Sequence, residues 1–186
     1  VSSSGKIAGV VVEAPHTGSP APFVLATRGL TASDTDSTLI APTMKNAFYG
    51  GTTGLSVQNT GAADALVEIT LIVSNAQNPI YIGETYTDQE VIPAGGQTVF
   101  SKHRGNLGGM PEGTVASAVV VSLDDTTYDP QPLAGTVNEA NNMGKATYAA
   151  FAQSTASTSV GAPLIKEMFF NMTTSAMVVN AGSSPT

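Results

Sequence analysis

Side chains able to act as nucleophiles, bases or metal ligands are few in this sequence. It contains no cysteine, which excludes thiolate chemistry, disulfides and thiolate metal sites. Only two histidines occur, His16 and His103, whereas a serine nucleophile needs an adjacent base and a zinc site needs three or four ligands. His103 stands in the polar segment Ser-Lys-His-Arg-Gly, which is typical of a solvated loop. We therefore expect no catalytic residue, no enzyme activity and no bound cofactor.

Acidic residues gather at two places in the chain. They are Glu84, Asp88 and Glu90 in the first cluster, and Asp124, Asp125 and Asp129 in the second. Paired carboxylates can hydrolyse glycosides, and clustered loop oxygens can bind calcium. Both clusters adjoin turn residues, where an aspartate commonly accepts hydrogen bonds from its own backbone. Neither the second cluster nor Asp34-Thr-Asp36 has the EF-hand spacing. We expect no metal site, with the second cluster as the calcium candidate.

The sequence also offers candidates for glycosylation, for a Lys–Asn cross-link and for sugar stacking. Asn171-Met-Thr is a sequon for N-glycosylation. A Lys–Asn isopeptide bond would suit a surface domain without cysteine, but it also needs a buried acid beside the pair. Tyrosine and phenylalanine could supply a sugar-stacking platform, although the chain has no tryptophan. The isopeptide candidates are Lys45, Lys145 and Lys166, and the stacking candidates are Phe48, Tyr49, Tyr81 and Tyr86.

Composition favours an all-β protein that binds neither nucleic acid nor membranes. Charged residues make up 11% of the chain and hydrophobic residues 41%, with frequent glycine and proline. This mixture suits short strands and turns that enclose a core. The net charge is −7, with seven basic residues, too few for a phosphate-binding stripe or a polybasic membrane patch. No apolar run approaches the length of a membrane-spanning helix.

An internal repeat organises the sequence. Residues 41–61 and 162–182 align without a gap at an offset of 121, and nine of the 21 positions are identical. A weaker match relates residues 5–13 to 113–121, and each is followed by a Pro-x-Pro step. The chain therefore divides into an N-terminal half-unit (1–40), a complete unit (41–161) and a C-terminal half-unit (162–186).

Hydrophobic patterning predicts an antiparallel β-sandwich, immunoglobulin-like or jelly-roll-like, in the complete unit. Segments 76–88 and 102–112 are expected to be loops, and 31–38 and 153–160 linkers. The segment nearest to a helix is 138–151. The expected strands are 6–13, 22–28, 53–59, 65–74, 89–92, 97–101, 114–122, 132–138, 145–152 and 174–181.

Several motifs of the unit resemble those of tandem β-sandwich repeats in large secreted or surface proteins of filamentous bacteria. Residues 49–61 match an aromatic-Gly-x-Thr-Thr-Gly-x-x-Val-Gln-Asn-x-Gly strand, and 92–100 match an Ile-Pro-x-Gly turn that ends on phenylalanine. The strand 113–122 and the segment Val137-Asn-Glu-Ala-Asn141 complete the pattern. In the second copy Asn171, Met172 and Val179 depart from it. The resemblance implies a structural or surface role without an assigned chemistry.

The phase of the repeat leads to a functional hypothesis. A half-unit cannot bury its apolar face alone, and its strand edges invite association. The two halves could pair within one chain, pair between chains, or belong to a longer tandem protein. We favour pairing between chains, which would build an extracellular filament, tube, sheath or surface layer from copies of one chain. The residues expected at the contacts are Ile7, Val10, Val12, Phe169, Thr174, Met177 and Val179.

Other classes remain open at the level of sequence. A cell-surface adhesin or carbohydrate-binding module is one alternative, and a viral capsid or tail protein is another. The chain begins with Val1 rather than methionine, for which removal of a signal peptide is the simplest explanation. We therefore expect the protein outside the cell or on its surface.

Overall fold

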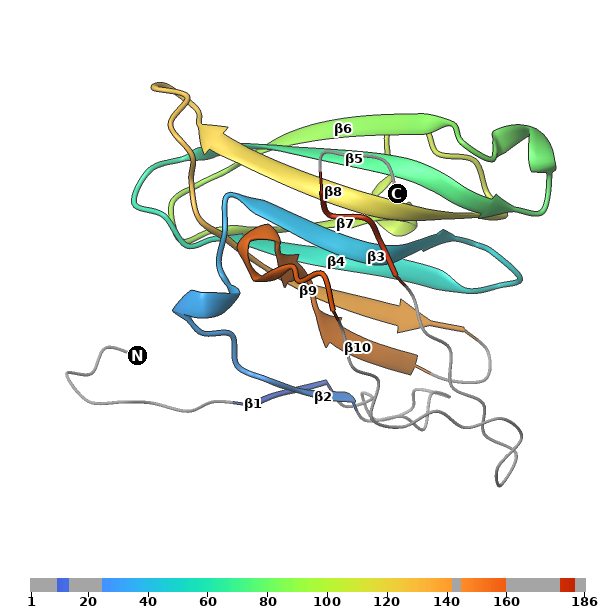
Figure 1. Ribbon diagram of the computed structural model, residues 1–186, viewed down its shortest axis with the longest axis horizontal. Coiled ribbons are helices and arrows are strands. Elements are labelled where there is room, and N and C mark those ends of the chain that lie inside the picture. Colours follow the sequence, from blue (N-terminus) through green and yellow to red (C-terminus); the bar gives the residue numbers. More distant parts are fainter. Residues whose placement is uncertain (1–9, 14–24, 142–144, 160–177, 183–186) are drawn as a thin grey trace.

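The protein is an all-β sandwich of two antiparallel sheets (Figure 1). The computed structural model describes residues 10–13, 25–141, 145–159 and 178–182. One sheet has four strands in the order β10-β9-β4-β7, and the other has five in the order β11-β3-β8-β5-β6. A separate hairpin of β1 and β2 lies alongside β10. The all-β sandwich predicted from the sequence is confirmed.

The strands are short and are joined by turns and 3-10 segments. The strands of the four-stranded sheet are β4 (Thr52–Asn59), β7 (Gln97–Ser101), β9 (Leu133–Ala140) and β10 (Lys145–Ala149). Those of the five-stranded sheet are β3 (Thr38–Asn46), β5 (Ala65–Ala76), β6 (Thr85–Ile92), β8 (Thr114–Asp124) and β11 (Phe151–Ala152). The hairpin is β1 (Val10–Glu13) and β2 (Leu25–Arg28). The 3-10 segments are η1 (Ala32–Asp34), η2 (Pro79–Tyr81), η3 (Lys102–Arg104) and η4 (Gln153–Thr155).

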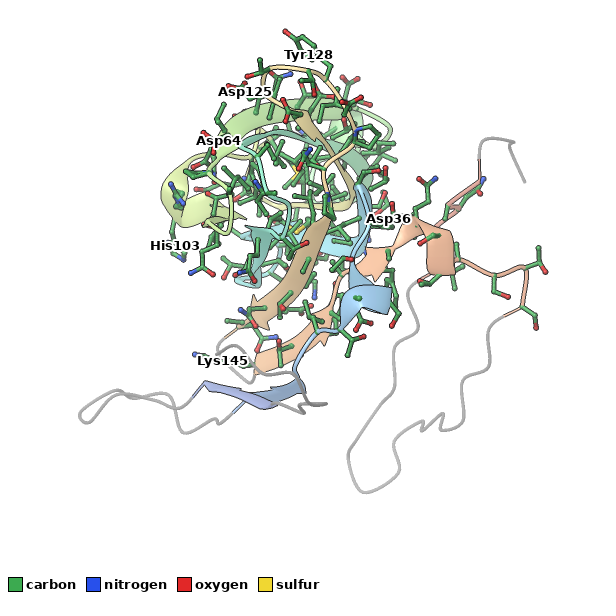
Figure 2. All side chains as sticks on the ribbon, turned by 90° about the vertical axis from the view of Figure 1, so that its left-hand side faces the viewer. Asp36, Asp64, His103, Asp125, Tyr128 and Lys145 are labelled. Carbon is green, nitrogen blue, oxygen red and sulfur yellow. The ribbon has the colours of Figure 1, made fainter. Side chains whose placement is uncertain are left out.

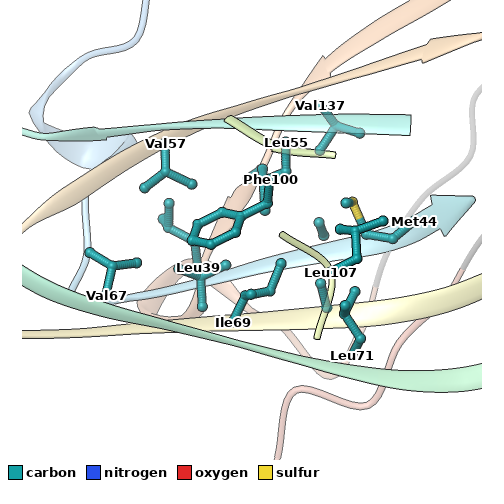
Figure 3. Close-up of a cluster of buried hydrophobic side chains, with 14 of the residues drawn as sticks. Leu39, Met44, Leu55, Val57, Val67, Ile69, Leu71, Phe100, Leu107 and Val137 are labelled. Atoms are coloured by element: carbon teal, nitrogen blue, oxygen red, sulfur yellow. The ribbon is translucent and has the colours of Figure 1, made fainter. Parts of the chain in front are cut away.

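The core lies between the two sheets and follows the two-residue period of the strands. On β5, Val67, Ile69 and Leu71 point inward and are fully buried, while the two residues between them are partly exposed. Leu55 of β4 and Phe100 of β7 enter from the other sheet (Figure 3). Each large apolar side chain buried in this way stabilises the fold by about 1.5–3 kcal/mol.

A loop closes the sandwich between the edge strands β6 and β7. Leu107 and Met110 of this loop are buried in the core. The amide of Gly108 donates a hydrogen bond of 3.0 Å to Oδ2 of Asp88 on β6. Gly108 has φ +58, and a Cβ atom there would lie 2.3 Å from the carbonyl oxygen of Thr87. Only glycine fits so close to the strand in this conformation.

The opposite side is closed where the chain changes sheets between β10 and β11. Tyr148 of β10 donates a hydrogen bond of 3.3 Å from its hydroxyl to the carbonyl oxygen of Thr43 on β3. Gly135 of β9 faces the same region, and a Cβ atom there would lie 2.9 Å from Cδ1 of Leu39 and 3.0 Å from Cβ of Ala150. Two sheets and the crossing chain therefore meet without room for a side chain at Gly135.

Four local expectations differ from the structure. A strand, β3, begins at Thr38, inside the segment expected to be a linker and before the expected boundary of the unit at 41. Strand β6 begins at Thr85, inside the expected loop 76–88. The segment nearest to a helix instead contains the end of β9 and strands β10 and β11, because its apolar residues pack in the sandwich. Residues 178–181, from the expected strand 174–181, are not in a strand, since no described strand pairs with them.

Candidate assembly interface

The histidine, acidic and lysine side chains considered as candidates for chemistry do not gather at one place in the structure. Figure 2 shows Asp125 and Tyr128 at one end, Lys145 at the other, and His103 and Asp36 on different sides. His103 lies in η3 and is exposed, and His16 lies outside the described residues. In the described part of the chain, no three histidine, cysteine or acidic side chains are grouped so as to hold a metal ion. No helix of this part is long and apolar enough to cross a membrane.

The calcium candidate is a tight turn after β8. Oδ1 of Asp124 accepts hydrogen bonds from the amides of Thr126 and Thr127, both at 2.7 Å. These bonds hold the pKa of Asp124 below its ordinary value. Oδ2 of Asp129 accepts a bond of 3.0 Å from the Thr127 hydroxyl, and the Asp125 amide donates to the Asp64 carbonyl oxygen at 3.0 Å. The aspartates therefore have backbone and turn partners, as expected of residues in such turns.

The stacking and cross-linking candidates also have structural partners. Tyr81 and Tyr86 are partly buried against the core. Burial and the charge of Glu84 raise the pKa of Tyr86. Phe48 and Tyr49 form an edge-to-face pair with ring centroids 4.7 Å apart. In the first acidic cluster, the Glu90 carboxylate accepts hydrogen bonds from the Thr98 hydroxyl and from the side chains of Arg104 and Asn106. Arg104 and Asn106 belong to the loop that closes the sandwich. Lys166 and Asn171 lie outside the described residues.

The first copy of the repeat, residues 41–61, is an arch that joins the two sheets. Its first half runs in β3 of the five-stranded sheet and its second half in β4 of the four-stranded sheet. The turn between them uses positive φ at Ala47, Tyr49 and Gly50. The amide of Lys45 on β3 donates a hydrogen bond of 3.1 Å to Oγ1 of Thr53 on β4. Lys45 and Thr53 are both identical in the second copy.

The other identical positions of the repeat also stabilise the arch. Nζ of Lys45 forms an ion pair with Oε1 of Glu139 on β9. Asn59, at the end of β4, donates from Nδ2 to the carbonyl oxygens of Ala63 at 2.7 Å and Ile92 at 3.0 Å. Its Oδ1 accepts the Gly61 amide at 2.9 Å. Ala41 and Val57 are fully buried. The repeat thus preserves residues that this arch uses.

The described part of the second copy, residues 178–182, forms one of these interactions, and its valine is exposed rather than buried. Oδ1 of Asn180 accepts the Gly182 amide at 2.9 Å, as Asn59 does with Gly61. Val178, however, is 93% exposed, whereas Val57 at the same place in the first copy is 0% exposed. The C-terminal half-unit therefore presents a core-type valine to solvent.

The N-terminal half-unit resembles the end of the unit. Residues 7–14 (IAGVVVEA) align with 133–140 (LAGTVNEA) at an offset of 126, with five of eight positions identical. β1 pairs with β2 as a hairpin, as β9 pairs with β10, whereas β8 pairs with β3 and β5. η1 and η4 then follow at the repeat offset of 121. This correspondence fits the topology better than the match of 5–13 to 113–121.

The similarity of residues 7–14 to 133–140 is carried by the shared pattern Ala-Gly-x-Val-x-Glu-Ala. The run of valines at 10–12 makes this pattern hard to recognise in the sequence. In the complete unit, β9 has β10 on one side and β4 on the other. β1 has β2 on one side, and no described strand pairs with its other edge. Within the described residues, the edge of β1 that corresponds to the β4 side of β9 has no paired strand.

Three of the seven expected contact residues lie within the described part of the chain. Val10 and Val12 are in β1, and Val179 is partly buried next to Val178. Ile7, Phe169, Thr174 and Met177 lie outside the described residues.

Comparison with known proteins adds little to this description. No protein-family model and no curated protein matches the chain. The crystal structure of Thermotoga maritima 1070 is similar over 62% of this chain and 92% of that chain, with 14% identity and a TM-score of 0.43. This similarity is too weak to carry an argument about function.

Proposed function

We propose that the protein is a structural subunit whose copies join through their half-units into an extracellular filament, tube, sheath or surface layer. The observation that carries the proposal is the contrast between the buried Val57 and the exposed Val178 at equivalent positions of the repeat. Burying a valine side chain is favourable by about 1.5–3 kcal/mol. A second copy can supply the missing cover.

The two half-units carry complementary parts. The C-terminal half-unit repeats the arch of β3 and β4, and the N-terminal half-unit resembles the hairpin of β9 and β10. In the complete unit β4 pairs with β9 over eight residues. The edge of β1 that has no partner among the described strands and the β4-like segment can therefore add to one another by strand pairing.

The geometry of such a contact favours an open polymer. The surfaces that meet are different parts of the chain, so each added copy leaves one half-unit free at either end. The low content of charged residues, 11%, suits burial between subunits. The resemblance of its motifs to tandem β-sandwich repeats of secreted or surface proteins is the ground for proposing that the polymer lies outside the cell or on its surface.

The proposal is tested by deleting residues 174–186 and comparing the truncated and full chains by negative-stain electron microscopy. The deletion leaves every strand of the sandwich intact. We expect polymers from the full chain and dispersed particles from the truncated chain, with equal circular dichroism spectra in the β region. Polymers from the truncated chain would show that the C-terminal half-unit is not the connector.

A further inference from the structure

The outward side of the five-stranded sheet carries large apolar side chains. Residues that lie directly opposite each other on paired strands point to the same side of a sheet. Val67, Ile69 and Leu71 of β5 point into the core, so the residues between them and the partners of those residues point outward. The apolar face consists of Leu66 of β5, Val91 of β6, Val119, Val121 and Leu123 of β8, and Phe151 of β11.

This apolar face is accessible at its centre and towards both sides. Val121 of β8 is 40% exposed, Val91 of β6 is 46% exposed and Phe151 of β11 is 52% exposed. Figure 1 shows β6, β5, β8 and β3 side by side in this sheet. An antiparallel sheet that borders water normally places polar residues on its outward side. The outward side of β8 is instead apolar like its inward side, which is typical of a strand covered on both faces.

The four-stranded sheet has the opposite character on its outward side. Leu55 of β4 and Val137 of β9 point into the core, so the alternate residues of these strands point outward. The outward residues include Ser56 and Gln58 of β4 and Thr136 and Asn138 of β9. This polar surface offers no complement to the apolar face, whereas a second apolar face does.

We infer that the apolar face of one copy packs against the same face of a second copy, as two stacked sheets. A contact of one surface with itself is two-fold symmetric. Four strands spaced by about 4.8 Å, over the eight residue pairs of β5 and β6, give a face of about 500 Å². Two such faces bury about 1,000 Å², which is at the low end for specific contacts between proteins. A single pair of copies is therefore held weakly.

The charge of Glu68 weakens the contact further. Among the outward residues of β5, β6 and β8, Glu68 is the one that carries a charge. It lies opposite Val121, at the centre of the apolar face. Its Oε2 accepts a hydrogen bond of 2.7 Å from Nε2 of Gln89. Burying a carboxylate between two copies still costs free energy, so paired copies separate readily.

A weak contact of this kind becomes effective when many copies act together. A polymer presents the apolar face once in every copy, so two polymers can join through many weak contacts at the same time. The contact therefore joins polymers side by side into a layer or the wall of a sheath, while dispersed single copies stay apart. This role rests on the proposed function, but the pairing of the two faces does not.

Cross-linking of single-cysteine variants tests the pairing of the faces in the full chain, which has no cysteine of its own. Val121→Cys places a thiol at the centre of the apolar face, and the control Gln58→Cys places one at an exposed outward position of β4. Each variant is treated with a short bismaleimide, and its reaction with a monofunctional maleimide corrects for the accessibility of the thiol. A residue near a two-fold axis meets its own counterpart, so we expect at least about tenfold more linked dimer from Val121→Cys than from Gln58→Cys.

Further substitutions in the Val121→Cys chain test whether the apolar face makes the contact. Val91→Asp adds a charge to this face and should reduce the linked dimer to the level of the control. Ile80→Asp adds the same charge on η2, outside the face, and should leave the yield unchanged. Glu68→Gln removes the charge and should raise the yield at least about threefold. Circular dichroism in the β region checks that each variant keeps the fold.

The outcomes separate this contact from the proposed function. Equal yields from Val121→Cys and Gln58→Cys would overturn the contact, and polymers of the unaltered chain would then leave the proposed function standing. An excess from Val121→Cys that persists with Val91→Asp would also overturn it, because the link would not need the apolar face. An excess that Val91→Asp removes, in a chain that forms no polymers, would support the pairing of the faces and reject the proposed function.

Discussion

Lys45 on β3 and Glu139 on β9 form an ion pair between strands of the two different sheets. Their side chains are 25% and 22% exposed, so water screens the attraction only in part. The pair lies where the arch leaves the five-stranded sheet, and the Lys45 amide is bound there by Thr53. The ion pair therefore helps to fix how the arch crosses from one sheet to the other.

Removing this ion pair should cost little stability. Lys45→Met and Glu139→Gln should each lower the free energy of unfolding by about 0.5–1 kcal/mol, because partly exposed pairs contribute in that range. A double-mutant cycle in urea denaturation measures the coupling between the two side chains. A coupling energy of zero would mean that the two groups only lie near each other.

Asn59 should matter far more to the stability of the single chain. It is fully buried and its side chain makes three hydrogen bonds. Asn59→Ala leaves the Ile92 carbonyl oxygen without this donor and should lower the free energy of unfolding by about 2–3 kcal/mol. The matched variant Asn180→Ala should leave the stability of the dispersed chain unchanged within about 0.5 kcal/mol. Equal losses in thermal denaturation would contradict the different roles assigned to the two asparagines.

The glycine on β9 provides a test of the packing between sheets. Gly135→Ala would place a methyl group 2.9 Å from Cδ1 of Leu39, so Leu39 and Ala150 must move apart. We expect a loss of about 1–3 kcal/mol in the free energy of unfolding. Gly54→Ala is the matched control, because a Cβ atom there would meet only ordinary contacts at 3.5 Å and beyond. It should lower the free energy of unfolding by less than Gly135→Ala does. Gly95 is unsuitable as a control because its φ of +70 would itself strain an alanine.

Much of the fold was predictable from the sequence because the core positions alternate. β5, β7 and β8 show this pattern with few interruptions, and they were predicted within a few residues of their ends. β3 was missed because Pro42 and a bulge between Ala41 and Met44 break its alternation. Its place depends on pairing with β8, which no local pattern reveals.

The candidate interface was predictable only in part. The repeat at an offset of 121 pointed to the C-terminal half-unit without any structure. The counterpart of β1 was assigned to 113–121, because valine-rich strands resemble one another. The hairpin pairing of β1 with β2 distinguishes β9 from β8, and this is tertiary information. Likewise, the exposure of Val178 follows only from the folded chain.

Asp36 joins the beginning of the unit to its end and should make stability depend on pH. Oδ2 accepts the Ser154 amide at 2.8 Å and Oδ1 accepts the Thr38 amide at 3.2 Å. Burial alone would raise the pKa of Asp36, but the hydrogen bonds from Ser154, Thr38 and Ser37 together hold it below the ordinary value of 3.8. A carboxyl whose pKa is lower in the folded state stabilises that state above its unfolded pKa.

The stabilisation by Asp36 should therefore be present at pH 7 and fade as the pH falls below about 4. Asp36→Asn should lower the urea midpoint at pH 7, by an amount that corresponds to about 1 kcal/mol or less because the group is partly exposed. The difference in midpoint between the variant and the unaltered chain should shrink progressively as the pH is lowered below about 4. A difference that is the same at pH 7 and at acidic pH would mean that the charge of Asp36 plays no part.

The exposed Val178 allows a direct test of assembly through the C-terminal half-unit. Val178→Asp places a charge where a second copy would bury an apolar side chain, and Ile80→Asp makes the same change at another exposed apolar position, on η2, which is 69% exposed. Sedimentation velocity over a range of protein concentrations measures association of the unaltered chain and both variants. We predict that the unaltered chain and the Ile80 variant form large assemblies while the Val178 variant stays monomeric. Assembly of the Val178 variant to the same extent as the other two would show that Val178 is not buried between copies.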